Sequence, residues 1–260
     1  MKDMLTPPRV GRRAVKVWQR NRDAWFKFYK ASLVGNLAEP ILFLLAFGVG
    51  LSKFIKDVNG IPYINYIAPG LVIATAMNAS SFECTFGSFT RMSTQKSYDA
   101  IIVTPVNIEE VAAGDILWGA TKGVISALVM LPVLAVFGLM NSPWLLLSPV
   151  LYVLVGLMFS AMALIVTAFV PSYDYYAYYF SLVISPMFFF SGIFFPLSTL
   201  PAWVSRLAWF FPLEHAVNIS RALSAGSLHV GLLGDFAWMA VFTFICCWLA
   251  IKFIKRRLVK

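Results

Sequence analysis

The chain has 260 residues, of which 60% are hydrophobic and only 13% are charged. So little polar surface cannot cover a soluble globule of this length, and the composition therefore predicts a protein of the lipid bilayer. The formal net charge of +9 is expected to reflect membrane topology and contact with anionic lipids, so no nucleic-acid partner is predicted.

We predict an all-α integral membrane protein with six transmembrane helices, because six segments reach the roughly 20 apolar residues that a crossing helix needs. These segments are residues 33–51, 66–86, 112–138, 144–170, 175–195 and 232–254. Most of the 21 Lys and Arg residues lie in the N-terminal arm, in the loop after the second segment and in the C-terminal tail. The opposite loops carry only Lys53, Lys56, Arg206 and Arg221. The positive-inside rule therefore places both termini in the cytoplasm.

Residues 1–30 are predicted to form a cytoplasmic amphipathic helix at the membrane interface, ahead of a six-span domain of residues 31–260. Apolar residues recur at helical spacing from Val10 to Phe28, and Arg and Lys residues lie between them. This pattern is typical of a basic helix on the inner leaflet. A positive topology signal that happens to be helical would give the same pattern, and the sequence leaves both interpretations open.

The long polar stretch of residues 87–111 is predicted to lie on the cytoplasmic side. Within it, residues 90–105 are predicted to form a short amphipathic helix with an apolar end at residues 101–103, and this helix is expected to dock a soluble partner. The residues expected to make the docking surface are Arg91, Met92, Lys96, Asp99, Ile102, Thr104 and Pro105.

Four ionisable residues lie inside the first three predicted spans, all toward the cytoplasmic half. The outer halves of the spans are uncharged except for Asp235, near the outer edge of the sixth. The four inner residues are Glu39, Glu83, Asp115 and Lys122. Ionisable groups at such depth are costly and normally face a bundle interior, a partner or water. They indicate either a hydrated vestibule open to the cytoplasm or polar contacts that join helices, with pairing among Glu39, Glu83 and Lys122.

The fifth span is rich in aromatic residues at both ends. The candidates for a substrate pathway are Tyr175, Tyr178, Tyr179, Phe190, Phe194 and Phe195. An interfacial aromatic belt explains residues at the membrane boundaries. However, neighbouring tyrosines cover more than one helix face, so some point into protein or a pathway, where aromatic faces and hydroxyls suit sugar rings.

Residues 196–231 are predicted to form an outer helical hairpin that is re-entrant or interfacial. Its first helix is expected to be capped by Ser198 or Thr199 and to stop before Pro212, and its second to end at Gly226. The hairpin either closes the outer end of a pathway or simply anchors the fold.

The sequence contains no phosphate loop and no recognisable hydrolase motif, so an enzyme is not predicted. No metal site is predicted, because His215 and His229 have no cysteine near them in the sequence. The three cysteines, Cys84, Cys246 and Cys247, all lie in predicted spans.

Several short motifs follow one another in the order and spacing of one family. They are SLVGNLAEP at residues 32–40, SSFE at 80–83, PSYDY at 171–175, SGIFFP at 191–196 with LP at 200–201, and FPLEH at 211–215. Through these motifs, and over nearly its whole length, the chain resembles the membrane subunit of type-2 ATP-binding-cassette exporters, and most closely the NodJ-like branch associated with lipo-oligosaccharide export.

The resemblance implies a multi-pass permease of the bacterial inner membrane that performs no chemistry itself. Its implied partners are a second copy of the chain or a related subunit, membrane lipids and two copies of a separate ATPase, which holds ATP and Mg; this chain needs no cofactor. Residues 91–105 then look like the coupling helix, although commoner family members carry acidic residues after the arginine, where this chain has STQK. That departure leaves the identity of the ATPase open.

The implied substrate is glycolipid-like: a lipid-linked oligosaccharide, a polysaccharide or a related amphiphile. In one alternative the protein is the same kind of ATP-driven exporter, but its substrate is a drug or a plain lipid. A second alternative is an ion-coupled carrier that uses Glu39, Glu83 and Lys122.

Overall fold

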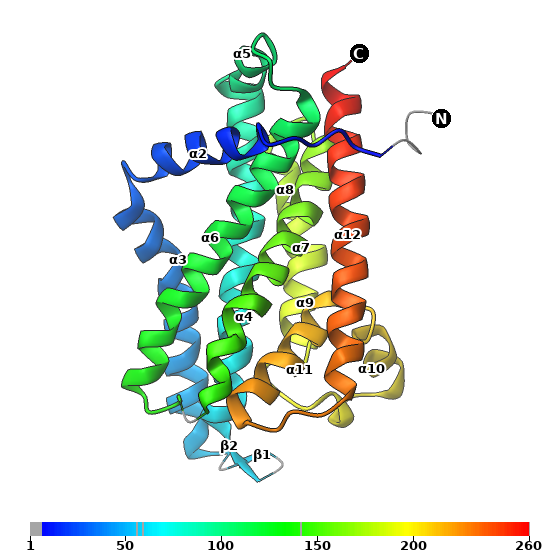
Figure 1. Ribbon diagram of the computed structural model, residues 1–260. Coiled ribbons are helices and arrows are strands. Elements are labelled where there is room, and N and C mark those ends of the chain that lie inside the picture. The colour runs from blue at the N-terminus through cyan, green and yellow to red at the C-terminus, as the bar shows by residue number, and fades with distance from the viewer. Residues whose placement is uncertain (1–6, 56, 59, 141, 260) are drawn as a thin grey trace.

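A computed structural model of the protein describes residues 7–55, 57–58, 60–140 and 142–259, and for Ile102 the backbone alone. The described chain is mostly helical (Figure 1). The longer helices are α2 (Ala14–Trp25), α3 (Tyr29–Phe43), α4 (Tyr63–Phe82), α6 (Ile108–Val136), α7 (Ser148–Phe169), α11 (Pro212–Ala225) and α12 (Gly231–Leu258). The shorter helices are α5 (Ser97–Ile102), α8 (Tyr176–Tyr179), α9 (Ser185–Phe190) and α10 (Ala202–Ala208).

Wider, π-helical stretches interrupt three of the helical columns. They occupy Leu44–Gly50, Glu83–Gly87, Thr90–Thr94 and Phe180–Ile184. Single 3-10 turns occupy Leu51–Lys53, Pro143–Leu147, Tyr173–Tyr175 and Leu197–Thr199. A two-residue hairpin, β1 (Asp57–Val58) and β2 (Ile61–Pro62), joins the first column to α4. Its antiparallel register pairs Asp57 with Pro62.

In the described part of the chain, four helical segments are long and apolar enough to cross a membrane. They are Tyr29–Lys53, Ile108–Val136, Pro143–Phe169 and Gly231–Leu258. They correspond to the first, third, fourth and sixth predicted spans. The second and fifth predicted spans are also helical, as α4 and as the column from α8 to α9, and both run alongside the others (Figure 1). That these two columns cross the membrane as well stays a prediction.

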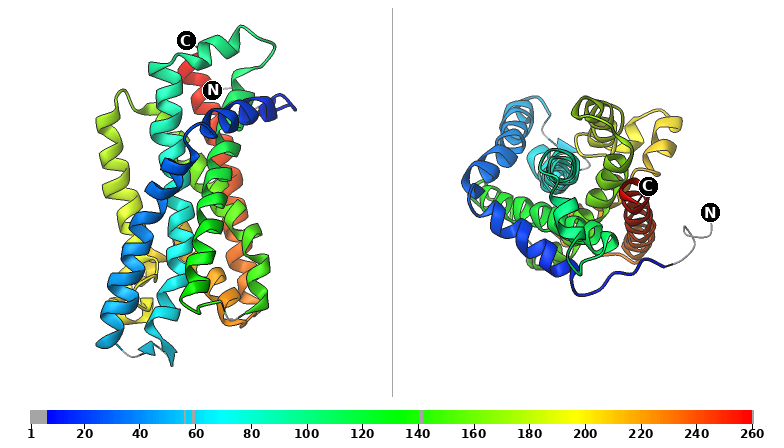
Figure 2. Two further views of the ribbon diagram at one scale, coloured as in Figure 1. Left: turned by 90° about the vertical axis from the view of Figure 1, so that its left-hand side faces the viewer. Right: turned by 90° about the horizontal axis from the view of Figure 1, so that it is seen from above.

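Helix α4 lies in the middle of the bundle and packs against α3, α6, α7 and α11 (Figure 2). Small residues make this close packing possible, here and between α6 and α7. A Cβ atom on Gly156 of α7 would lie 2.9 Å from the Ala120 Cα of α6. A Cβ on Gly119 would lie 2.4 Å from the Ser160 hydroxyl. Both positions therefore require glycine for the observed helix spacing.

Helix α2 lies across the end of the bundle that also holds α5 and the C-terminal part of α12 (Figure 1). Its buried residues include Ala14, Val17 and Trp25, which recur at helical spacing and face α6. The Trp25 ring contacts the Trp118 ring of α6 at a centroid distance of 5.8 Å. The predicted amphipathic helix is therefore present, but much of its apolar face packs against protein.

Helix α6 begins with a capping box, which fixes where the loop after α5 ends. The Glu110 backbone N–H donates to the Asn107 side chain at 2.8 Å, and the Asn107 N–H donates to the Glu110 carboxylate at 3.0 Å. The helix thus starts four residues before the predicted boundary at residue 112.

The hairpin predicted at residues 196–231 contains two helices, α10 and α11. As predicted, α11 ends at Gly226, whose φ of 70° is left-handed. The predicted cap of α10 is wrong: its first turn has no side-chain cap, and Thr199 donates instead to the Pro196 carbonyl at 2.7 Å. Helix α10 is largely exposed, whereas α11 is buried against α4 and α12.

Candidate functional site

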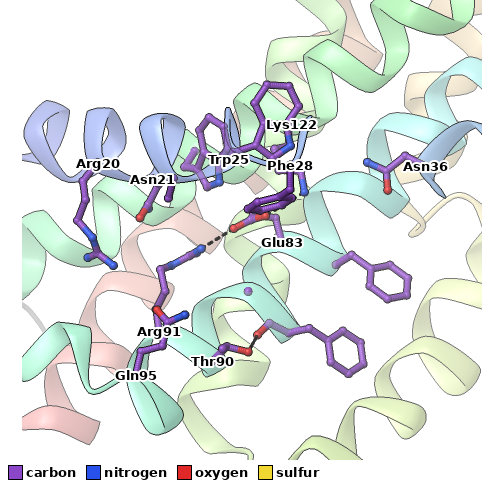
Figure 3. A pocket seen from close by; sticks show the side chains of 15 residues that line it. Arg20, Asn21, Trp25, Phe28, Asn36, Glu83, Thr90, Arg91, Gln95 and Lys122 are labelled. Carbon is purple, nitrogen blue, oxygen red and sulfur yellow. Dashed lines mark hydrogen bonds and ion pairs between the residues drawn. The ribbon is translucent and has the colours of Figure 1, made fainter. Parts of the chain in front are cut away.

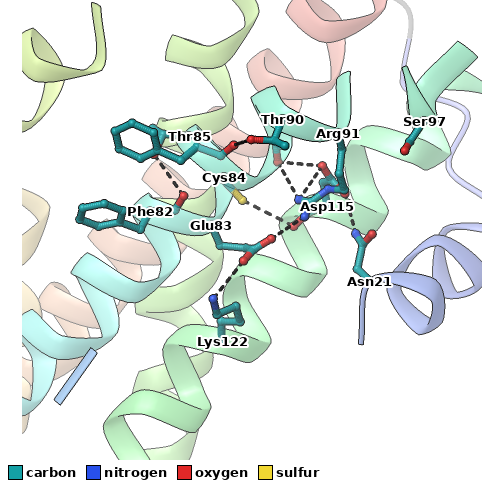
Figure 4. A network of polar contacts seen from close by, with 12 residues as sticks. Asn21, Phe82, Glu83, Cys84, Thr85, Thr90, Arg91, Ser97, Asp115 and Lys122 are labelled. Atoms are coloured by element: carbon teal, nitrogen blue, oxygen red, sulfur yellow. Dashed lines mark hydrogen bonds and ion pairs between the residues drawn. The ribbon is translucent and has the colours of Figure 1, made fainter. Parts of the chain in front are cut away.

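A buried polar network lies at the α5 end of the bundle and is centred on Asp115 of α6 (Figure 4). The Asp115 carboxylate is fully buried and accepts four hydrogen bonds. Its Oδ1 accepts from Asn21 of α2 at 2.7 Å, and its Oδ2 accepts from Ser88 at 2.7 Å, from Arg91 at 3.1 Å and from the Tyr98 hydroxyl of α5. One carboxylate therefore connects α2, α5, α6 and the segment that follows α4.

A second carboxylate, Glu83, extends this network toward the middle of the bundle. Its two oxygens pair with the Arg91 guanidinium at 2.6 Å and with the Lys122 ammonium at 3.1 Å. Two cations and two anions thus compensate one another, which buried charges require. The predicted pairing of Glu83 with Lys122 is confirmed. Glu39 was expected to join them, but its side chain lies exposed on α3 and has no ion pair among the described residues.

The electrostatics of the network favour a neutral Tyr98 and a charged Arg91. Burial and the adjacent Asp115 carboxylate raise the pKa of Tyr98 well above its usual value, so its hydroxyl stays a donor. Burial acts to lower the pKa of Arg91, but the Asp115 and Glu83 carboxylates outweigh it, and the pKa lies above its usual value. The network is therefore held by charge-assisted hydrogen bonds, which are stronger than neutral ones.

A cavity of about 470 Å³ adjoins the network between α2, the start of α3, the end of α4 and α6 (Figure 3). Three cations line it, Arg20, Arg91 and Lys122, together with aromatic rings that include Trp25 and Trp118. Burial lowers the pKa of Arg20, and the positive charge of Arg91 lowers it further. Glu83 also lines the cavity and pairs with Arg91 and Lys122, whereas Arg20 has no ion pair among the described residues. Arg20 is therefore the cation that favours a polar or anionic group in this cavity.

The predicted docking helix is broken. A π-helical stretch ends at Thr94, Lys96 adopts a left-handed φ of 49°, and α5 follows. Arg91 and Met92 were expected on the docking surface, but Arg91 is held inside the network and Met92 is buried. The exposed residues of the predicted set are Lys96, Asp99, Thr104 and Pro105. The side chain of Ile102 lies outside the described residues.

The sequence analysis missed two residues of this segment, one exposed and one buried. Val103, just after α5, is 86% exposed. Tyr98 is 1% exposed and anchors α5 to Asp115. An aromatic residue within a polar loop could have indicated that Tyr98 is buried. Its partner could not be identified from sequence, because Asp115 lies 17 residues away on another helix.

The aromatic candidates divide into exposed and buried residues. Tyr175 and Tyr178 are exposed, and their rings meet edge to face at 6.2 Å. Tyr179 is 5% exposed and lies in the core.

At the other end of this column, Phe190 is exposed and Phe195 is half-buried. Phe194 is buried and contacts Phe47 of the first column at 5.2 Å. Tyr179 and Phe194 thus serve packing in this structure, and Tyr175, Tyr178, Phe190 and the half-buried Phe195 are left as candidates for a substrate pathway.

Residues 14–224 match the model of the ABC-2 type transporter family. The chain therefore belongs to this family of membrane transport proteins. It is 37% identical over 254 residues to nodulation protein J of Rhizobium meliloti (strain 1021), a match that covers 96% of each chain. It is 34% identical to nodulation protein J of Bradyrhizobium diazoefficiens, over 94% of this chain and 93% of that one. It is 22% identical to the inner membrane transport permease YadH of Escherichia coli (strain K12), over 91% and 93% of the two chains.

The family and the apolar helices together define a multi-pass membrane protein that is a transport subunit. Membership of the family implies an ATP-binding-cassette partner in general. The predicted resemblance to type-2 exporters of the NodJ-like branch is thereby confirmed.

Proposed function

We propose that the chain is the transmembrane subunit of an ATP-driven exporter that carries a lipid-linked oligosaccharide or a related amphiphile out across the bacterial inner membrane. It works as a homodimer with two copies of a separate ATPase, and α4 and the α8–α9 column complete six spans in each subunit. The observation that carries the proposal is an exposed helix, α5, anchored by Tyr98 to a buried charge network beside a cavity. Similarity to nodulation protein J over 96% of the chain supports it.

Coupling begins at the solvent-exposed face of α5 and its flanking residues, where Lys96, Asp99 and Val103 are available to contact the ATPase. On the inner side, Tyr98 bonds to Asp115, which in turn binds Asn21 and Arg91. Each of the Tyr98 and Asn21 contacts is a hydrogen bond to a buried charge, which contributes about 1.5–3 kcal/mol. A displacement of α5 therefore moves α2 and α6 with it, because separating them would leave the buried Asp115 carboxylate short of donors.

The cavity beside the network supplies a place for the hydrophilic head of the substrate. Its volume of about 470 Å³ lies within the roughly 300–1,000 Å³ range of small-molecule sites. The exposed aromatic rings of Phe28 and Phe82 can stack on the C–H faces of sugar rings. Asn36 and Lys122 offer hydrogen-bond donors to hydroxyl or phosphate oxygens. The lipid tail would remain in the bilayer beside α3, where Val34 and Leu42 are exposed.

Replacing Val103 with glutamate tests the docking surface. Val103 is 86% exposed next to α5, so the charge should not disturb folding but should weaken contact with the ATPase. The tagged chain is solubilised from its native membranes, and the co-purifying ATPase is identified by its phosphate loop and quantified. Val230→Glu is the matched control, because Val230 is 83% exposed at the other end of the bundle, before α12.

We expect the ATPase to be recovered with the wild type and with V230E, and to be lost or strongly reduced with V103E. Equal recovery with V103E would refute docking at α5. In the reconstituted complex, a glycolipid should stimulate ATP hydrolysis and a hydrophobic drug should not. Transport that continues without any ATPase would favour the ion-coupled carrier instead.

A further inference from the structure

Helix α11 approaches α12 at the end of the bundle opposite α5 (Figure 1). Three side chains with metal-binding atoms, from these two helices, lie close together there. Glu214 and His215 lie in the first turn of α11, and Asp235 lies in the first turns of α12. His215 Nδ1 is 2.7 Å from Asp235 Oδ1 and 3.4 Å from Glu214 Oε2. All three donor atoms lie within 4.8 Å of one another.

Hydrogen bonding fixes the state of the His215 ring. Its Nε2 is 2.8 Å from the Trp209 backbone carbonyl, which can only accept, so Nε2 carries a proton and donates it. In the neutral ring, Nδ1 then presents a lone pair to two carboxylates. Three acceptors face one another at this point, so a proton or a metal ion must lie among them. An N–H bonded to a backbone carbonyl is also the usual arrangement of a metal-binding histidine.

A proton on Nδ1 does not satisfy the whole cluster, because it would bridge only to Asp235. Glu214 is 8% exposed, and its Oε2 has no hydrogen-bond partner among the described residues. Its other oxygen, Oε1, already accepts from Asn218 at 2.6 Å. The unpartnered oxygen points toward His215, where a divalent ion would contact Oε2, Nδ1 and Oδ1 together and balance both carboxylate charges.

The separations suit a small transition-metal ion with mixed nitrogen and oxygen ligands. Zn²⁺ bonds of about 2.0–2.2 Å in a tetrahedron place ligand atoms roughly 3.3 Å apart. The distance from Nδ1 to Glu214 Oε2 already matches this value, at 3.4 Å. Asp235 must withdraw by roughly 0.6 Å to match it, and its side chain, which is 21% exposed, has an open side toward which it can shift.

An ion can reach this point from outside. Asp235 lines a surface cavity of about 260 Å³ together with Asn218, Arg221 and His229. The Arg221 guanidinium donates to the Gly192 carbonyl at 2.7 Å and lies over the Tyr66 ring, and it has no ion pair with Asp235 among the described residues. The outer side of the cluster thus offers both an entrance and a place for a water ligand.

We propose that Glu214, His215 and Asp235 bind a divalent transition-metal ion of the Zn²⁺ type that clamps α11 to α12 on the outer side of the membrane. The ion holds the outer hairpin against the last span. The site does not depend on the proposed transport function, and it revises the prediction that the chain has no metal site.

The test is Zn²⁺ binding to the purified full-length chain, carried by a tag without histidine, treated with chelator and kept in detergent. We expect one Zn²⁺ per chain by elemental analysis and a higher Tm with Zn²⁺, but no such effect with Mg²⁺. Asp235→Asn and Glu214→Gln keep the side-chain shapes and should each weaken Zn²⁺ binding by at least about 10-fold. The control is Asp57→Asn, the same carboxylate-to-amide change at an exposed residue of β1 that is no part of the cluster or its cavity, and it should bind as the wild type does.

Two results would overturn the proposal. One is a chain that takes up no Zn²⁺, in which case a proton bridges His215 and Asp235. The other is Zn²⁺ binding that survives both carboxylate changes, which would place the ion elsewhere. If D235N fails to fold, E214Q alone tests the proposal. This variant is expected to fold, because its amide oxygen can still accept the hydrogen bond from Asn218.

Discussion

Replacing Asp115 with asparagine is expected to destabilise the protein by about 3–5 kcal/mol, the range for removing one partner of a buried ion pair. Asp115 is 0% exposed, and all four of its contacts are with donors. An amide has a single oxygen to replace two, and its NH₂ group faces a donor in either orientation. Arg91 would also lose one of its two carboxylate partners and keep only Glu83.

Thermal unfolding of the purified chain in detergent measures this loss. For a chain of this size, 1 kcal/mol corresponds to about 2–4 °C in Tm, so D115N should lower Tm by roughly 6–20 °C. Asp99→Asn is the matched control, because Asp99 is exposed on α5 and its change should stay within about 0.5 kcal/mol. A D115N variant that melts within about 2 °C of the wild type would show that the network does not hold these helices together.

Two further predictions concern the exposed tyrosines and the helix contacts. Replacing both Tyr175 and Tyr178 with alanine should weaken a saccharide substrate more than an alkyl one, because stacking on sugar faces is lost; equal effects on ATPase stimulation by the two substrates would favour a simple membrane belt. Gly156→Ala should cost about 1–3 kcal/mol, since the new methyl overlaps Ala120. Gly35→Ala, with nothing within 4 Å, should be neutral or stabilising in the same melting assay.

The apolar runs were sufficient to predict the helices, because a helix in lipid is set by length and composition alone. Local rules also succeeded at Gly226, where a helix end needs only its own neighbours. The exposed face of α5 was partly predictable, since Lys96 and Asp99 are polar residues in a polar loop. What failed was the assignment of Arg91, which belongs to the same loop but points into the bundle.

Tertiary contacts explain the failures. Arg91 turns inward because Asp115, 24 residues away on α6, is brought beside it by packing that no local pattern encodes. Glu39 was expected to pair because it lies at a similar depth in its span, but depth does not determine the face of a helix. Asp235 completes a cluster with His215 across two helices, 20 residues apart in the chain. Charged residues within spans could be identified from sequence, but their partners could not.

The π-helical stretches after α4 could convert a shift along the helix axis into a rotation about it. A π turn holds one residue more than an α turn, and each residue of an α-helix advances the chain by roughly 100° about the axis. Glu83 begins one such stretch, Glu83–Gly87, and Arg91 lies just beyond it. If this stretch tightened into α-helix, everything after it, Arg91 included, would rotate while Glu83 stayed in place. A small push along α5 would then turn the Arg91 guanidinium away from Glu83 and break that ion pair.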